Sequence, residues 1–198
     1  MPLTKQAKTL NKNQVSSVLN YLASSRNTLR NEVIFLLSVK AGLRAKEIAG
    51  LKWEMVLESD ATLAGFISLT NEASKGNSGR HIPLNKGLKA RLAELLEATR
   101  CRQSFSPTDH VVATERSDRT TAQAIVNMFS NWYADLGLVG CSSHSGRRTF
   151  ITNAARTITT VGGSLRDVQY LAGHSSLQTT ERYIEYSEAA RRSVVDVI

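Results

Sequence analysis

The chain has 198 residues, which suits one domain or one domain with a small appendage. A hydrophobic fraction of 41% is ample for a packed core, but the longest apolar run, residues 33–37, is far too short to span a bilayer. The 25 Lys and Arg residues exceed the 17 Asp and Glu residues, and the formal net charge of +8 suits a polyanionic partner. Charge alone fits a basic protein without such a partner equally well.

The start of the chain and its cysteines indicate a cytoplasmic protein. No apolar signal core follows Met1, so the sequence does not suggest export. Two cysteines forty residues apart, Cys101 and Cys141, do not form the disulfide framework of a small secreted domain, and we expect reduced thiols. Cys141 lies three residues before His144, but no second pair of ligands accompanies them, which disfavours a metal site.

Helical periodicity dominates the first fifty residues. Residues 9–24 carry apolar side chains at helical spacing, with Thr9 or Asn11 as the cap. A more apolar helix is expected over residues 28–41, where Gly42 suits a left-handed C-terminal cap. Residues 45–51 predict a short third helix.

Between residues 53 and 84 the spacing of apolar residues changes from a helical pattern to a strand pattern. Residues 66–69 and 81–83 read as strands, and the polar loop 71–79 between them contains two glycines that favour a turn. Asn85 is then expected to cap a helix, and residues 121–136 are expected to form another. From Gly146 onward the pattern predicts short helices. Together these elements predict an α+β fold that is mostly helical, with one small antiparallel sheet inserted in the first half of the chain.

Five residues far apart in the sequence could gather around a single phosphate: Arg44, His144, Arg147, His174 and Tyr183. Phosphodiester cleavage places negative charge on non-bridging oxygens, and no cluster of Asp and Glu at ligand spacing predicts a metal site that would neutralise it. Guanidinium groups can replace the metal, because they are always charged and match two phosphate oxygens. A single arginine, taken alone, more often forms a surface ion pair.

Tyr183 is the candidate nucleophile. Its phenol, with an ordinary pKa of about 10, needs a positive field or a base to attack at neutral pH. Tyr186 lies three residues further on, on the same helical face, and is the alternative. Lys75, in the loop between the strands, could protonate the leaving 5′ oxygen. His144 and His174 could donate to phosphate oxygens or shuttle the tyrosine proton.

These motifs, in this order, resemble the catalytic domain of the tyrosine recombinases, the phage-integrase family, from about residue 9 to residue 186. GLRAKEIAGLKW is similar to the first arginine motif, which makes Arg44 catalytic and Glu47 its acidic partner. SKGNSGRHIPL resembles the hairpin that carries the catalytic lysine, which points to Lys75. HSGRR is similar to the His-x-x-Arg motif. LAGHSSLQTTERY places a histidine nine residues before the nucleophile, which selects Tyr183 over Tyr186.

The resemblance implies a three-stranded antiparallel sheet and a reaction without metal or cofactor. Tyr183 would attack the scissile phosphate to form a 3′-phosphotyrosyl link and release a 5′-hydroxyl, which then attacks a second duplex. The implied activity is site-specific recombination of double-stranded DNA by integration, excision or inversion. Four protomers would act together on DNA, with accessory DNA-bending proteins as candidate partners. A type IB topoisomerase and a non-catalytic DNA-binding regulator with the same fold are the alternatives.

The chain also departs from the family pattern. Gly146 stands just before the second arginine, where the family commonly has an apolar residue. The catalytic domain spans residues 1–198 without the usual core-binding domain ahead of it, so we expect either a catalytic fragment or a naturally short recombinase like the fimbrial phase-switch invertases. The apolar tail, residues 187–198, could pack into a neighbouring protomer or onto its own core.

Further DNA-backbone contacts are predicted at four arginines and at one threonine near a helix N-terminus, where phosphate binds favourably. These residues are Arg80, Arg116, Arg119, Thr120 and Arg148.

Overall fold

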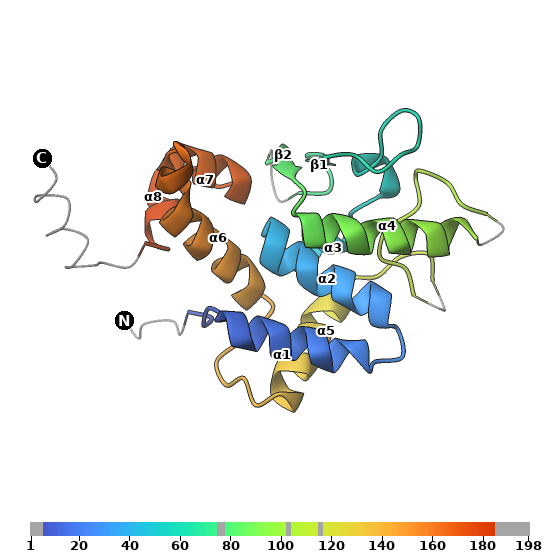
Figure 1. Cartoon of the computed structure of the whole chain (residues 1–198), viewed down its shortest axis with the longest axis horizontal. Coiled ribbons are helices and arrows are strands. Elements are labelled where there is room, and N and C mark those ends of the chain that lie inside the picture. Colours follow the sequence, from blue (N-terminus) through green and yellow to red (C-terminus); the bar gives the residue numbers. More distant parts are fainter. Residues whose placement is uncertain (1–5, 75–77, 102–103, 115–116, 185–198) are drawn as a thin grey trace, which may run out of the picture.

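Helices carry most of the fold, in the order that the sequence predicts. The computed structural model describes residues 6–74, 78–101, 104–114 and 117–184 (Figure 1). The α-helices are α1 (Lys12–Ala23), α2 (Thr28–Ala41), α3 (Ala45–Ala49), α4 (Lys86–Arg100), α5 (Ala122–Asp135), α6 (Ser145–Thr157), α7 (Leu165–Ala172) and α8 (Leu177–Glu181). Two 3₁₀ helices, η1 (Trp53–Met55) and η2 (Ile158–Val161), and two strands, β1 (Phe66–Leu69) and β2 (Arg80–Pro83), complete the set.

Side-chain caps begin several of these helices. Asn11, rather than Thr9, caps α1 in a reciprocal capping box with Gln14. As predicted, Asn85 accepts a hydrogen bond from the first turn of α4, and Gly42 ends α2 in the left-handed conformation, at φ 68°. Local sequence therefore sets these boundaries.

The sheet is smaller than predicted. β1 and β2 pair antiparallel, with Ile67 opposite Ile82, and the described residues contain no third strand. Leu57 and Leu63 form only an isolated bridge, because the Asp60 side chain accepts hydrogen bonds from Thr62 and closes a tight turn between them. The prediction of a mostly helical α+β fold is confirmed, whereas the prediction of three strands is wrong.

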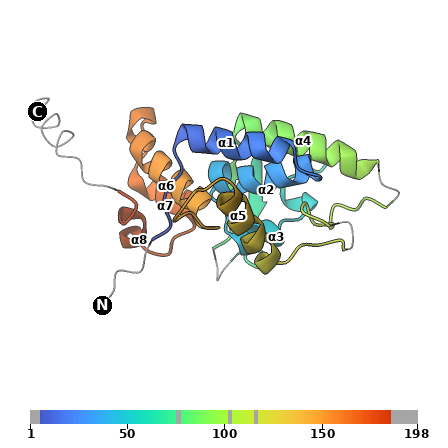
Figure 2. The ribbon, with the colours of Figure 1, turned by 90° about the horizontal axis from the view of Figure 1, so that it is seen from below.

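The core centres on α2, most of whose residues are buried. Figure 1 shows α2 flanked by α1 and α4, and Figure 2 shows α6, α7 and α8 gathered at one end of the molecule. A second, smaller apolar cluster of Ile151, Val168 and Ala172 lies among these C-terminal helices. No helix in the described part of the chain has the length and apolarity needed to cross a bilayer.

Helix α6 packs on α2 through two glycines. A Cβ atom added at Gly146 would lie 2.4 Å from the Ser38 hydroxyl oxygen, and one added at Gly42 would lie 2.4 Å from the Phe150 ring. These contacts leave no space for a side chain at either glycine. The close approach places the first turn of α6, which carries Arg147, against the end of α2.

Gly146→Ala should therefore lower the free energy of unfolding by about 1–3 kcal/mol, because overpacking outweighs the gain in helix propensity. Urea denaturation followed by circular dichroism measures the change. The same substitution in a Ser38→Gly background should cost less, since the nearest contact is gone. An equal cost in both backgrounds would contradict this origin.

Candidate active site

One cavity of about 540 Å³ brings together five of the six residues predicted to be catalytic. Its lining includes Arg44, His144, Arg147, His174 and Tyr183, which come from four separate segments of the chain. The sixth predicted residue, Lys75, lies outside the described residues, as does Tyr186.

Arg44 is held by a buried carboxylate. It is the N-cap of α3, and Glu47, three residues on, accepts hydrogen bonds from the Arg44 backbone N–H at 2.8 Å and from its guanidinium at 2.7 Å. The Glu47 side chain is fully buried, whereas that of Arg44 is 25% exposed and reaches the cavity. Glu47, the acidic partner expected from the sequence, thus contacts both the backbone and the side chain of Arg44.

Arg147 bridges two distant turns from inside the protein. Its guanidinium donates to the carbonyl oxygen of Gly42 at 2.6 Å and to that of Ala172, which joins the end of α2 to the end of α7. Burial, followed by the nearby charge of Arg44, lowers the pKa of Arg147 to about 10. The group therefore still carries its charge at neutral pH.

His174 follows the left-handed cap of α7 and faces the same cavity. Its ring Nδ1 lies 3.0 Å from the Thr180 hydroxyl, and its backbone carbonyl accepts from the Gln169 side chain at 3.1 Å. Burial, followed by the positive charges of Arg147 and Arg44, lowers the pKa of His174 to about 4. The imidazole is therefore neutral at pH 7.

Tyr183 lies just past α8, half-buried against the smaller C-terminal cluster. Its ring stacks on that of His174 with centroids 5.6 Å apart, and the Arg148 guanidinium lies 5.7 Å from the centre of the same ring. A tyrosine in the usual surface position would lack this pair of neighbours. The spacing-based choice of Tyr183 thus falls on a residue that lines the cavity.

His144 occupies a more open position than His174. It is the N-cap residue of α6, its backbone N–H donates to the Ser142 hydroxyl at 3.3 Å, and its side chain is exposed at the cavity wall. The two histidines thus meet the cavity in different environments, since His144 is exposed and His174 is partly buried.

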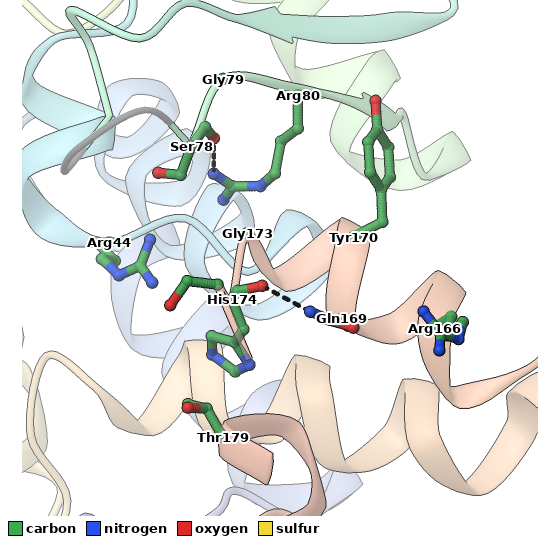
Figure 3. Close-up of a pocket in the computed structure, with 11 residues that line it drawn as sticks. Arg44, Ser78, Gly79, Arg80, Arg166, Gln169, Tyr170, Gly173, His174 and Thr179 are labelled. Carbon is green, nitrogen blue, oxygen red and sulfur yellow. Dashed lines mark hydrogen bonds between the residues drawn. The ribbon is translucent and has the colours of Figure 1, made fainter. Parts of the chain in front are cut away.

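A second cavity of about 830 Å³ adjoins the first, sharing Arg44, His174 and Thr179 with it (Figure 3). Sequence reasoning missed Thr179 and also Thr180, whose hydroxyl orients the His174 ring. The available signal was the Thr-Thr pair between the histidine and the tyrosine in LQTTERY.

The phage integrase family sequence model matches residues 8–189 of this chain. The chain belongs to the phage integrase family. Tyrosine recombinase XerC of Shewanella sp. (strain ANA-3) is 30% identical over 187 residues, which cover 90% of this chain and 57% of XerC. Tyrosine recombinase XerA of Pyrococcus horikoshii is 27% identical, over 97% of this chain and 63% of XerA. The chain thus spans about three fifths of these relatives, and the family predicted from the motifs is confirmed.

Solved integrase-family structures share the fold. A crystal structure of XerA recombinase superposes with a TM-score of 0.73 at 22% identity, covering 98% of this chain and 64% of the other. The Tn1549 transposon integrase in complex with a circular intermediate DNA gives a TM-score of 0.76 at 18% identity, covering 98% of this chain and 67% of the other. At these identities the likeness concerns the fold alone.

The departure of this phage-integrase domain at Gly146 has a local cause. The Ser38 hydroxyl and Cβ occupy the space that an apolar side chain would need, so glycine lets α6 come close enough to α2 for Arg147 to reach the Gly42 carbonyl. The glycine therefore preserves the position of the arginine that follows it.

Two of the predicted DNA contacts fall on buried residues, Arg80 and Thr120. The Arg80 side chain is 1% exposed and ion-paired with Glu47, at the wall of the second cavity. Thr120 is also buried, and the N-cap of α5 is Thr121 instead. Arg119 is exposed, Arg148 lines the first cavity, and Arg116 lies outside the described residues.

The lowered pKa of His174 predicts how the stability of the protein depends on pH. Because the folded protein disfavours the imidazolium, the unfolded chain takes up a proton first as the pH falls from about 6.5 to about 4, and stability declines over that window. As the pH falls through this window, the melting temperature of His174→Gln should therefore decrease less than that of the unaltered protein. His81→Gln is the control, since His81 lies outside both cavities. An NMR titration of His174 near pH 6.5 in the folded protein would contradict the prediction.

Proposed function

We propose that this domain catalyses site-specific DNA strand transfer through a 3′-phosphotyrosyl intermediate. The observation that carries the proposal is the single cavity into which Arg44, Arg147, two histidines and Tyr183 converge from distant parts of the chain. Membership of the phage integrase family supports it, and the solved relatives include XerH recombinase bound to its difH substrate in a pre-cleavage complex.

In this mechanism the two arginines bind the scissile phosphate. Arg44 presents a partly exposed guanidinium, and Arg147 contributes positive charge from a buried position. Both would stabilise the negative charge that develops on the non-bridging oxygens as phosphorus becomes five-coordinate. Since these charges are permanent, we expect cleavage to proceed in EDTA.

Tyr183 attacks phosphorus with its phenol oxygen, and the bond from phosphorus to the 5′ oxygen breaks. The phenol proton leaves Tyr183, and the departing 5′ oxygen gains a proton, for which Lys75 is the proposed donor. Neutral His174 suits donation of a ring N–H to a phosphate oxygen, while the exposed His144 suits acceptance of the tyrosine proton. Rejoining reverses these steps with a 5′-hydroxyl from either duplex.

For recombination, we extend this proposal from one active site to an assembly of several protomers on DNA. Strand exchange requires two double-stranded sites, and we propose four protomers on the DNA, with the tail, residues 187–198, reaching a neighbour and DNA-bending proteins assisting. The tail lies outside the described residues. The basic charge of the chain supports DNA as the partner.

Tyr183→Phe should abolish the covalent protein–DNA adduct while leaving DNA affinity nearly unchanged, because it removes only the attacking oxygen. The assay incubates protein in EDTA with nicked suicide duplexes tiled from the DNA that flanks its gene, then denatures and resolves the products on a gel. Peptide mapping of the adduct identifies the linked tyrosine.

Tyr186→Phe is the matched control and should form the adduct normally. An adduct with Tyr183→Phe but not with Tyr186→Phe would transfer the nucleophile to Tyr186. Sequence-specific binding without any adduct would instead support a non-catalytic regulator, and adducts without sequence preference would support a topoisomerase-like activity.

A further inference from the structure

Arg80 lies where three segments of the site meet, and none of the proposed chemical steps uses it. Its Nε donates to the Leu171 carbonyl at 2.9 Å, near the end of α7. One terminal nitrogen donates to the Ser78 carbonyl at 3.1 Å, at the start of the chain segment that leads into β2. This nitrogen also donates to Glu47 of α3, and so does the other terminal nitrogen, at 3.1 and 3.2 Å. A single side chain therefore joins α3, the strand hairpin and α7.

Glu47 is shared between two arginines. One carboxylate oxygen accepts from the Arg44 guanidinium at 2.7 Å and from Arg80 at 3.1 Å. The other oxygen accepts from the Arg44 backbone N–H at 2.8 Å and from Arg80 at 3.2 Å. Four hydrogen bonds match the capacity of one ionised carboxylate, so turning the Arg44 side chain away would leave the buried Glu47 short of one donor.

The turn that carries His174 rests directly on the same guanidinium. Gly173 adopts a left-handed conformation at φ 59°, and a Cβ atom added there would lie 2.7 Å from an Arg80 terminal nitrogen and 3.0 Å from its central carbon. The backbone of the turn thus packs against the Arg80 plane, as Figure 3 shows for Arg80, Gly173 and His174. His174 directly follows this turn in the sequence.

We propose that Arg80 is a positioning residue for strand transfer: by fixing Glu47 it orients Arg44 toward the scissile phosphate, and by supporting Gly173 it sets the position of His174. This inference rests on the proposed function above. It gives Arg80 a role inside the site in place of the DNA-backbone contact predicted from the sequence.

Lysine cannot reproduce this arrangement. Arg80 offers donors in a fixed plane, and four of its hydrogen bonds point to three different segments. A lysine ammonium keeps the charge but lacks the planar fork, so it cannot bind both Glu47 oxygens and reach the Leu171 carbonyl. The proposal therefore requires Arg80→Lys to fail as well as the neutral Arg80→Met.

The test compares Arg80→Lys and Arg80→Met with Arg91→Met. Arg91 is the control for loss of an arginine–glutamate ion pair away from the site: it pairs with the nearly buried Glu32 at 3.0 Å, but its own side chain is 43% exposed, on α4 and outside both cavities. Single-turnover adduct formation should fall by about 100-fold in both Arg80 variants, the cost of a misplaced catalytic group. DNA affinity should stay within about threefold, since affinity comes from exposed cations.

The pH dependence of adduct formation distinguishes a positioning role of Arg80 from a merely structural one. Burial raises the pKa of Glu47, but the hydrogen bonds and charges of Arg80 and Arg44 outweigh burial and lower it overall. Glu47 is faced by Arg44 from its own helix, by Arg80 from β2 and by the charge of Arg147 from α6. In Arg80→Met the burial remains while the main lowering cause is lost, so the pKa rises. Adduct formation should then decline with falling pH at a higher pH than in the unaltered protein.

Two NMR readouts need no cleavage and keep this inference distinct from the proposed function. The Arg44 Nε–H signal and the pH titration of the Glu47 carboxyl carbon should both change in Arg80→Met and not in Arg91→Met. If the unaltered protein forms no adduct, the proposed function fails while these signals still report on Arg44.

Adduct formation by the Arg80 variants within about threefold of Arg91→Met would overturn the proposal. An unchanged Arg44 signal would do so as well. Loss of folding in both Arg80 variants, judged by melting temperature, would also overturn it, because Arg80 would then serve the fold and not the orientation of the site.

Discussion

The site depends on one buried carboxylate. An ionised group out of contact with water is tolerated only when its oxygens are fully hydrogen-bonded, and Glu47 meets this condition through Arg44 and Arg80. Both arginines therefore compensate the charge of the same carboxylate. The orientation of Arg44 is consequently set by the internal charge balance of the protein before any DNA is bound, and such preorganisation is what electrostatic stabilisation of a transition state requires.

The charged groups around Glu47 carry a net positive charge. Arg44, Arg80 and Arg147 lie around a single carboxylate. Burial, followed by the positive charges of these arginines, lowers the pKa values of Arg147 and His174. A phosphodiester bound between Arg44 and Arg147 would offset these positive charges. By linkage, the same anion would raise the proton affinity of His174, so phosphate binding and the protonation of this histidine are coupled.

Sequence reasoning found five of the residues that line the first cavity because their motifs are short and their order is specific. Its predictions of DNA contacts at Arg80 and Thr120 fell on buried side chains. Composition made Arg80 one of many cations, and surface exposure is the default for such a residue. A stronger clue was available in the strand itself: Arg80 lies two residues before the buried Ile82, and side chains two apart point to the same face. The prediction of a third strand was wrong for a different reason. The turn at Asp60 leaves only one bridging pair, and alternation of apolar and polar residues does not reveal how short such a pairing is.

The parts of the site differ in how firmly the fold holds them. Arg147 is fixed by the contact of α6 with α2 at Gly146 and by carbonyls at two helix ends, so its geometry is tied to the main core. Tyr183 instead follows the five-residue helix α8, in which only Thr180 is buried, and it packs on the smaller C-terminal cluster. Segments with few buried contacts open at a lower free-energy cost than core helices. The frame that holds Arg147 is therefore the more rigid part of the site, and the segment that carries Tyr183 is the part that opens at lower cost, which suits the proposed role of Tyr183 as the nucleophile.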